Sequence, residues 1–335
     1  MTFPMTFLFF FIFLILGTIL SISSSSWFGA WVGLELNMMS FIPIISMKMN
    51  SYLSESALKY FLIQALASTL IILSSSLFLT FSAFSTLIIL LSLLLKLGAS
   101  PFHFWFPQVM EGLTWPQALT LMSIQKLAPM FLISYLTLTT MNLQLILSSA
   151  LLSAIMGALG GLNLMKLRKI MAFSSINHMS WLLTAITIND SMWMMYFFFY
   201  IIISSSIVVL FHLMQTFSIP QLLNSNYINP IWKLSIPMSL LSLGGLPPFT
   251  GFAPKWIMIQ TMLMNNMFIM LFVLLSSALV TLYFYLRVSI PFFLLLNPNL
   301  SLTMMYSPHQ LSFFMPFFIF LNFSGLLLPL FPIFL

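Results

Sequence analysis

The sequence predicts an all-α integral membrane protein with about 11 transmembrane helices. This prediction rests on three observations: 61% of the 335 residues are hydrophobic, only 4% are charged, and the apolar residues occur in runs of about 20. A soluble domain carries roughly 25% charged residues, so most of this chain must face lipid. Its runs lack the alternation of barrel strands, which leaves helices. We therefore expect a single polytopic membrane domain over residues 1–335.

Apolar runs separated by polar or proline-containing breaks define the predicted spans. These are residues 3–22, 27–46, 56–80, 83–106, 117–136, 142–162, 169–188, 191–214, 232–262, 266–291 and 311–334. Residues 215–231 carry prolines and asparagines typical of an exposed connection. The span at 311–334 is expected to be an extra C-terminal helix.

The composition excludes several classes of function. A chain with no cysteine cannot hold an iron–sulfur cluster or a zinc ion through thiolates. No dinucleotide fingerprint and no Walker loop is present, so the sequence indicates no bound nucleotide and no metal site. The net charge of +6 comes from basic residues scattered among apolar spans, which argues against nucleic acid. The remaining chemistry is that of protons or ions.

The distribution of Lys and Arg predicts the orientation. Basic residues gather in loops of one parity, which the positive-inside rule places on the cytoplasmic or matrix side. They are Lys48, Lys166, Arg168, Lys169, Lys233 and Arg287. With about 11 helices the N-terminus lies on that basic side and the C-terminus on the opposite one. The group from Lys166 to Lys169 is read as a topology signal or a lipid head-group patch.

Two predicted spans contain helix-breaking residues beside a lysine. Proline removes an amide donor and glycine eases unwinding, so both spans should be interrupted. The breaking residues are Gly98, Pro101, Gly244, Gly245, Pro247 and Pro248. Their positions predict inverted five-helix repeats over about residues 3–138 and 142–291, an arrangement typical of transporter sites. The alternative is a pair of ordinary proline kinks.

Four ionisable residues are expected at membrane depth: Glu35, Lys96, Lys126 and Lys255. A charge there is costly, so such residues usually face a bundle interior or a wet cavity. Lysine suits proton transfer because desolvation lowers its pKa and a nearby carboxylate raises it. We predict a relay in which Glu35 modulates Lys96 and water connects the lysines. The alternative is a static buried ion pair with two snorkelling lysines.

Two further residues are candidates for supporting roles. His178 is expected in the middle of a span among polar neighbours, where it either stabilises a water wire or makes a packing hydrogen bond. Lys59 follows Glu55 by four residues, and a helix-end ion pair is the default interpretation.

Several motifs together resemble the chain 2 family of mitochondrial NADH:ubiquinone oxidoreductase, the antiporter-like membrane subunits of respiratory complex I. The motifs lie at residues 31–37 (WVGLELN), 55–62 (ESALKYFL), 96–107 (KLGASPFHFWFP), 125–129 (QKLAP), 160–175 and 243–256. The resemblance implies an antiporter-like fold. It assigns Glu35 as the carboxylate partner, Lys96 as its paired lysine, and Lys126 and Lys255 as further relay residues. One departure is Ser180, which stands before Trp181 where the family usually has glycine.

The resemblance also implies a place in the cell and a set of partners. It implies a multi-pass subunit of the inner mitochondrial membrane, with its N-terminus in the matrix and its C-terminus in the intermembrane space. Expected partners are the other membrane-arm and accessory subunits and lipids including cardiolipin. NADH, FMN, iron–sulfur clusters and ubiquinone are expected on other subunits, with no cofactor bound by this chain.

The function predicted from these observations is proton translocation within complex I while other subunits carry electrons. Two alternatives stay open. One is a stand-alone cation/proton antiporter of related fold. The other is a structural or assembly subunit without its own proton path.

Overall fold

The computed structural model describes residues 5–47, 50–223 and 230–294. Over these residues the regular structure is helical, apart from one isolated β-bridge between Lys166 and Ser218. The all-α prediction is therefore confirmed. Lys48, the side chain of Lys233 and the predicted span 311–334 lie outside the described residues.

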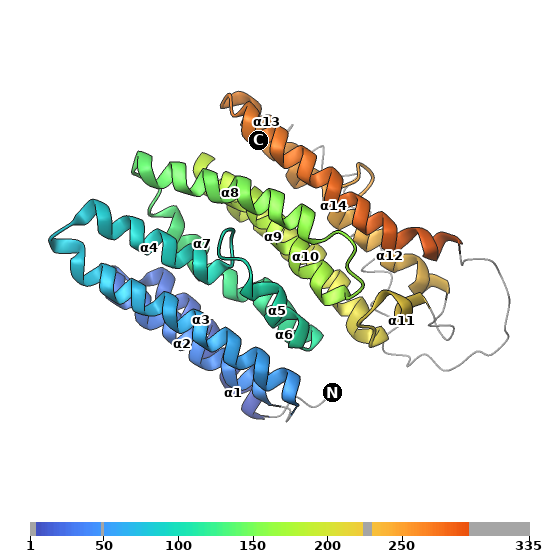
Figure 1. Cartoon of the computed structure of the whole chain (residues 1–335), viewed down its shortest axis with the longest axis horizontal. Coiled ribbons are helices and arrows are strands. Elements are labelled where there is room, and N and C mark those ends of the chain that lie inside the picture. Colours follow the sequence, from blue (N-terminus) through green and yellow to red (C-terminus); the bar gives the residue numbers. More distant parts are fainter. Residues whose placement is uncertain (1–4, 48–49, 224–229, 295–335) are drawn as a thin grey trace. The chain divides into compact units, whose positions relative to one another are not determined.

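The chain divides into two compact units, Met1–Met156 and Gly157–Leu335. The helices of the first unit are α1 (Met5–Ser23), α2 (Trp27–Ser46), α3 (Ser51–Ser76), the 3₁₀ helix η1 (Leu77–Leu79), α4 (Ser82–Leu97), α5 (Trp105–Gly112), α6 (Trp115–Met122) and α7 (Ile124–Ser134), and α8 (Thr140–Gly160) crosses the boundary (Figure 1). The second unit contains α9 (Leu167–Ile188), α10 (Asp190–Met214), α11 (Ile219–Leu223), α12 (Pro230–Gly244), α13 (Phe252–Met264) and α14 (Phe268–Leu294). Because the boundary lies within α8, the repeats at 3–138 and 142–291 stay a prediction.

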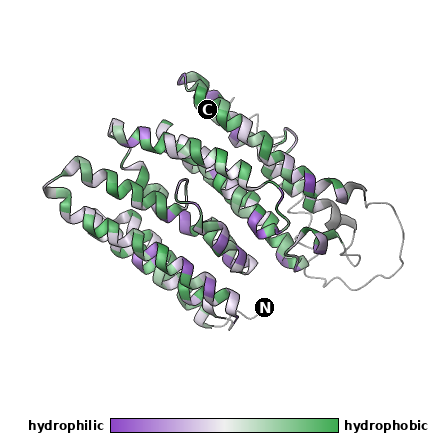
Figure 2. Ribbon diagram, viewed as in Figure 1, coloured by the Kyte–Doolittle hydropathy of each residue, from purple (hydrophilic) through white to green (hydrophobic). Residues whose placement is uncertain are grey.

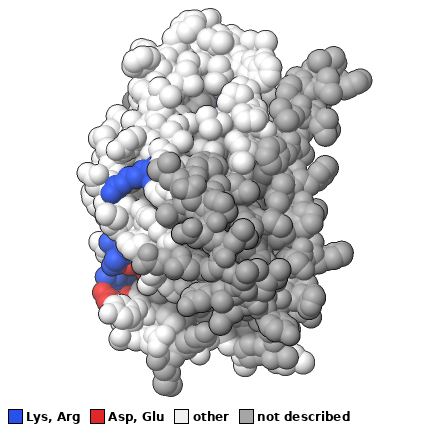
Figure 3. Space-filling model, turned by 90° about the vertical axis from the view of Figure 1, so that its right-hand side faces the viewer, with Lys and Arg blue, Asp and Glu red and all other residues white. Residues whose placement is uncertain are grey.

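Six helices in the described part of the chain are long and apolar enough to cross a membrane: α1, α2, α3, α8, α10 and α14. Figure 2 shows that apolar residues dominate their length. Among the described residues visible in Figure 3, charged side chains form small groups near one edge of the view. The bounds of α2 match the predicted span, whereas α3 begins at Ser51, earlier than expected. The total number of spans stays a prediction, because the other predicted spans coincide with shorter helices or with α9, which is not counted among these six.

Close packing of α1 against α2 depends on two glycines. A Cβ on Gly17 would lie 2.8 Å from the backbone nitrogen of Asn37, and one on Gly33 would lie 2.5 Å from the backbone nitrogen of Ser21. Small residues let helix backbones approach where no hydrophobic driving force between helices exists. This contact holds α2, which carries Glu35, against its neighbour.

Both predicted interruptions are present. Helix α4 ends at Leu97 and α5 begins at Trp105, while α12 ends at Gly244 and α13 begins at Phe252. The residue after each first half is a glycine in the left-handed region, Gly98 with φ 69° and Gly245 with φ 80°. Glycine takes this conformation without the steric penalty of a Cβ, so it terminates a helix readily.

A third interruption corrects the predicted continuous span at 117–136. Helix α6 ends at Met122, and Ser123, with φ −110° and ψ −81°, separates it from α7. The Ser123 hydroxyl donates to the Leu119 carbonyl at 2.7 Å, and the Lys126 amide donates to the Ser123 carbonyl three residues back. Serine back-bonding of this kind bends helices, and Pro129 removes a further amide donor in the next turn.

Candidate functional site

A small cavity lies inside the first unit, and both Lys96 and Lys126 line it. Its volume is ≈ 20 Å³. The lining residues are Leu34, Asn37, Met38, Tyr60, Gln64, Lys96, Leu97, Trp105, Phe106, Leu121, Gln125, Lys126 and Pro129. A cavity of this size and polarity has room for about one water molecule. The structure therefore brings together two of the predicted relay lysines.

Two buried polar atoms of the cavity lining indicate that it is hydrated. In the part of the chain that the structure describes, Asn37 Oδ1 and Gln125 Nε2 have no protein hydrogen-bond partner. Buried polar groups are nearly always satisfied, by protein or by ordered water. An acceptor and a donor that line the same cavity as two lysines are suited to bind water.

Lys96 lies in the last turn of α4, where only 7% of it is exposed. The interruption frees the carbonyls of this turn, and neutral groups satisfy them. The amides of Gly98 and Ala99 donate to the carbonyls of Leu95 and Leu94, both at 3.1 Å. Two side chains complete the set: Trp105 Nε1 donates to the Leu95 carbonyl at 3.1 Å, and Gln64 Nε2 donates to the Lys96 carbonyl at 3.2 Å. The Lys96 side chain is therefore not needed as a cap for α4.

Lys126 lies in the first turn of α7 and is 3% exposed. Its Nζ stands 5.0 Å from the centroid of the Phe106 ring, a cation–π distance. The neighbouring Gln125 accepts a hydrogen bond from the Tyr60 hydroxyl at 3.1 Å. The bend at Ser123 thus positions a buried lysine against α5 and beside a side-chain hydrogen bond from α3.

Glu35 is half-buried on α2, the helix that contributes Leu34, Asn37 and Met38 to the cavity lining. Glu35 and Lys96 do not form an ion pair. Among the residues described, the ion pair of the structure joins Lys59 to Glu55. Glu35 also does not line the cavity. This geometry differs from the static buried ion pair of the alternative interpretation, because the Glu35 carboxylate and the Lys96 ammonium are not in ion-pair contact.

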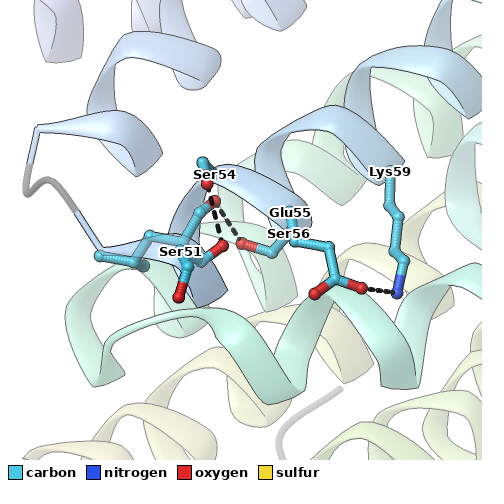
Figure 4. A network of polar contacts seen from close by, with 6 residues as sticks. Ser51, Ser54, Glu55, Ser56 and Lys59 are labelled. Atoms are coloured by element: carbon cyan, nitrogen blue, oxygen red, sulfur yellow. Dashed lines mark hydrogen bonds and ion pairs between the residues drawn. The ribbon is translucent and has the colours of Figure 1, made fainter.

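Lys59 forms an exposed ion pair with Glu55. Its Nζ lies 2.6 Å from Glu55 Oε1 in an exposed pair in the N-terminal part of α3, as Figure 4 shows. Pairs spaced by four residues on a helix surface stabilise it by roughly 0.2–0.5 kcal/mol. The helix-end pair is confirmed, and Lys59 is not among the residues that line the cavity.

Lys255 lies in the first turn of α13 and is 7% exposed. Its Nζ donates to the carbonyl of Gly244, the last residue of α12, at 2.7 Å. A Cβ on Gly245 would lie 2.8 Å from Lys255 Cδ, so the glycine makes room for this side chain. A cation at the negative end of a helix is favourable. The lysine of the second unit is therefore the cap of its broken helix.

His178, on α9, lines a smaller cavity of ≈ 10 Å³ in the second unit. Its Nδ1 is 2.9 Å from the Tyr196 hydroxyl of α10. The same cavity is lined by Gly251 and Pro254, which lie at the interruption between α12 and α13. Sequence reasoning missed Tyr196, because nothing in the apolar run of α10 marks one tyrosine as the histidine's partner.

The arrangement is suited to holding protons. A lysine nitrogen can bind or release a proton, and the three buried lysines lie in the first or last turns of interrupted helices, where Lys255 Nζ donates to the Gly244 carbonyl. Over the described residues no group of three or more His, Asp or Glu side chains is placed to hold a metal ion. Buried ionisable residues beside broken membrane helices are typical of proton- and ion-translocating membrane proteins.

Comparisons with known proteins place the chain within this class. The family model for NADH:quinone oxidoreductase/Mrp antiporter transmembrane proteins matches residues 81–281. NADH-ubiquinone oxidoreductase chain 2 of Anopheles gambiae is 46% identical over 288 residues, which cover 83% of each chain. The same chain of Dasypus novemcinctus is 38% identical over 99% of both. The protein therefore belongs to the NADH:quinone oxidoreductase/Mrp antiporter family.

Solved structures share the fold. A chain of respiratory complex I from Thermus thermophilus superimposes with a TM-score of 0.83 at 23% identity, covering 97% of this chain and 78% of the other. A chain of the Mrp complex from Dietzia sp. gives a TM-score of 0.74 at 16% identity, covering 83% and 59%. The antiporter-like fold expected from the resemblance is confirmed.

Proposed function

We propose that this chain is a proton-translocating subunit of the membrane arm of respiratory NADH:ubiquinone oxidoreductase. Its close relatives are named as chain 2 of that enzyme, which supports membership in the complex. The observation that carries proton translocation is the pair Lys96 and Lys126, buried in one unit and lining one polar cavity beside a broken helix. Electrons travel on other subunits, where NADH, FMN, iron–sulfur clusters and ubiquinone bind.

In the first unit the proton moves between two lysine nitrogens. The Lys96 ammonium gives a proton to water in the cavity, and that water gives a proton to the neutral Lys126 amine. No net charge is created in the step, because one ammonium becomes an amine as the other amine becomes an ammonium. Glu35 sets the balance, since a carboxylate that approaches Lys96 stabilises the ammonium and one that recedes favours release.

In the second unit the proton on Lys255 is linked to helix geometry. The ammonium makes a charge-assisted hydrogen bond to the Gly244 carbonyl, and such bonds are roughly twice as strong as neutral ones. Loss of the proton weakens this cap and loosens the end of α12. His178 and Tyr196 line the small cavity beside the interruption between α12 and α13, and they support it as a hydrogen-bonded pair.

The proposal includes a location and an orientation. The chain is a multi-pass protein of the inner mitochondrial membrane, with its basic side and N-terminus in the matrix and its C-terminus in the intermembrane space. Protons move from the matrix side to the intermembrane side when quinone reduction elsewhere releases free energy. The other membrane-arm and accessory subunits are its partners.

The test is Lys96→Met in the assembled complex, with the number of protons pumped per NADH oxidised measured in intact membranes. We expect the variant to assemble and to pump fewer protons per NADH. The matched control is Lys59→Met, which removes a lysine from an exposed pair and should leave the ratio unchanged.

Two outcomes would overturn the proposal. An assembled Lys96→Met complex with a normal ratio indicates a structural subunit. Cation/proton exchange by the purified chain alone, reconstituted in vesicles, indicates a stand-alone antiporter.

A further inference from the structure

The indole nitrogen of Trp31 on α2 is a buried donor without an acceptor. Trp31 as a whole is half-buried, but its Nε1 is fully buried and has no hydrogen-bond partner among the described residues. Buried polar groups are nearly always satisfied, by protein or by ordered water. The backbone carbonyls around Trp31 already accept the amides of the helix. The acceptor for this N–H is therefore to be sought among side chains, water or a neighbouring chain.

Glu35 is the side-chain acceptor that lies nearest along the helix. It follows Trp31 by four residues, and within residues 27–35 it is the only residue whose side chain carries an oxygen atom. Residues four apart lie on one face of a helix, with their Cβ atoms roughly 5–6 Å apart. A long side chain in a helix leans back over the preceding turn, which directs the Glu35 carboxylate toward Trp31. The unsatisfied donor and the carboxylate are therefore neighbours.

The Glu35 carboxylate is not held by a lysine. It is half-buried, and within the described part of the chain it forms no ion pair. Leu34 and Met38, which flank Glu35 on α2, line the cavity that Lys96 also lines. Rotation about the side-chain bonds of Glu35 can therefore carry its carboxylate either toward the lysine cavity or toward the Trp31 indole.

The chain contains a hydrogen bond of the same kind in α10. Trp193 is buried, and its Nε1 donates to Asp190 Oδ1 at 3.2 Å across one helical turn. A hydrogen bond to an ionised acceptor is roughly twice as strong as one between neutral groups. An indole and a carboxylate one turn apart on a helix can thus meet in a strong hydrogen bond.

We propose that Trp31 is a positioning residue for Glu35, whose carboxylate it holds by an N–H hydrogen bond when the carboxylate recedes from Lys96. This inference rests on the proposed function, in which the separation of Glu35 and Lys96 decides whether Lys96 keeps its proton. A carboxylate beside Lys96 stabilises the ammonium, and a carboxylate bound to Trp31 does not, so the ammonium then gives its proton to the cavity water. Trp31 itself neither gains nor loses a proton.

The chemistry of indole suits this role. A carboxylate that leaves its lysine inside the membrane would be buried without a partner, which is costly. The indole N–H supplies a partner at the receded position. Because indole is a donor only and does not titrate in the physiological range, it holds the carboxylate without exchanging a proton with it.

The first test measures the hydrogen bond itself in the assembled complex, by ultraviolet resonance Raman spectroscopy of the indole bands. The contribution of Trp31 is the difference between the spectra of the wild type and Trp31→Phe. We expect part of it to match the hydrogen-bonded indole of Trp193, obtained in the same way from Trp193→Phe. That part should be lost in Glu35→Leu, and it should grow in Lys96→Met, because the carboxylate then has no lysine to approach.

The second test separates the hydrogen bond from packing. Trp31→Phe keeps an aromatic ring and loses the donor, whereas Trp31→Gln loses the ring and keeps an N–H donor. Without the donor, the balance between the two carboxylate positions should shift roughly tenfold toward Lys96. The protons pumped per NADH should therefore fall in Trp31→Phe and recover in part in Trp31→Gln. Trp193→Phe is the matched control: it removes a bonded indole N–H outside the lysine cavity and should leave the ratio unchanged.

Three results would overturn the inference. One is a Trp31 contribution that neither Glu35→Leu nor Lys96→Met changes. Another is a higher pumping ratio in Trp31→Phe than in Trp31→Gln, which would show a packing role. The third is a map of the assembled complex in which the Trp31 N–H donates to a neighbouring chain. Failure of the proposed function would look different, because Lys96→Met would then pump normally while the Trp31 bands still responded to Glu35→Leu.

Discussion

The two broken helices end in the same way but are capped by different chemistry. Gly98 and Gly245 both take a left-handed conformation after the first half-helix. At the end of α4 the neutral side chains of Gln64 and Trp105 satisfy the carbonyls. At the end of α12 the carbonyl of Gly244 is satisfied by Lys255. In the first unit neutral side chains cap the helix and Lys96 carries the buried charge. In the second unit Lys255 both caps the helix and carries the charge.

The loops after the two breaks also differ in how tightly they pack. A Cβ on Gly98 would meet Phe106 Cβ at 3.2 Å, a contact that small shifts relieve. A Cβ on Gly251 would meet the Ser242 carbonyl oxygen at 1.7 Å. The second break is therefore folded back onto its own helix, with backbone against backbone. Variants in this break should be the more damaging.

The largest expected effect follows from Gly251→Ala. Because the new methyl group overlaps a backbone oxygen, the loop must move, and we expect a loss of about 3 kcal/mol or more in the free energy of unfolding. Abundance and thermal stability of the assembled protein measure it. Gly244→Ala is the control: its Cβ meets Tyr285 at 3.5 Å, so stability should change by less than about 1 kcal/mol. Equal tolerance of both variants would contradict the packing described.

The next effect compares the two lysines. Lys255→Met and Lys96→Met both remove a buried charge, but only the first leaves a helix-end carbonyl without its donor. We expect Lys255→Met to be less stable than Lys96→Met by about 1.5–3 kcal/mol. Thermal unfolding of the two variants, measured side by side, checks this. Equal stability would mean that the Lys255 bond does not act as a cap.

A smaller effect is expected from the neutral caps of α4. Gln64→Leu removes the donor to the Lys96 carbonyl and should lower the free energy of unfolding by about 1–3 kcal/mol. Trp105→Phe should lower it by about 0.5–1.5 kcal/mol, because the Leu95 carbonyl still accepts a hydrogen bond from the Gly98 amide. Because the Gln64 amide also lines the cavity, only Trp105→Phe is expected to leave the protons pumped per NADH normal in complexes that assemble. A fall in that ratio for Trp105→Phe at normal abundance would show that this cap takes part in proton movement.

The smallest effect on stability is expected from Asn37→Leu. The Asn37 oxygen has no protein partner among the described residues, so replacing it with an apolar group of similar size should change the free energy of unfolding by less than about 1 kcal/mol. Proton pumping should nevertheless fall, because a drier cavity holds water less well. Unchanged pumping would argue that this wall of the cavity does not bind the water used.

Local chemistry made the interruptions predictable, whereas tertiary contacts did not follow from the sequence. Glycine, proline and a lysine in one segment mark a break whatever surrounds it, and both breaks are where the sequence places them. The bend at Ser123 went unnoticed because serine breaks helices only in certain contexts. Burial of Lys96, Lys126 and Lys255 followed from their positions inside apolar runs.

The partners of these lysines needed the structure. Nothing in the sequence indicates that Gln64 caps α4, that Lys255 caps α12, or that Arg287 lies beside the loop that carries Asn163. Each of these contacts joins residues from different helices, from a helix and a distant loop, or from the two halves of a broken helix. The relay from the first unit to Lys255 stays a prediction.

The central claim is that the cavity lined by Lys96 and Lys126 is wet and exchanges protons with both lysines. A high-resolution map of the assembled complex, in which ordered waters are visible, tests it most directly. We predict an ordered water in this cavity, hydrogen-bonded to a lysine Nζ and to Asn37 or Gln125. A cavity that is empty in every captured state, with both lysines sealed from either aqueous phase, would contradict the account.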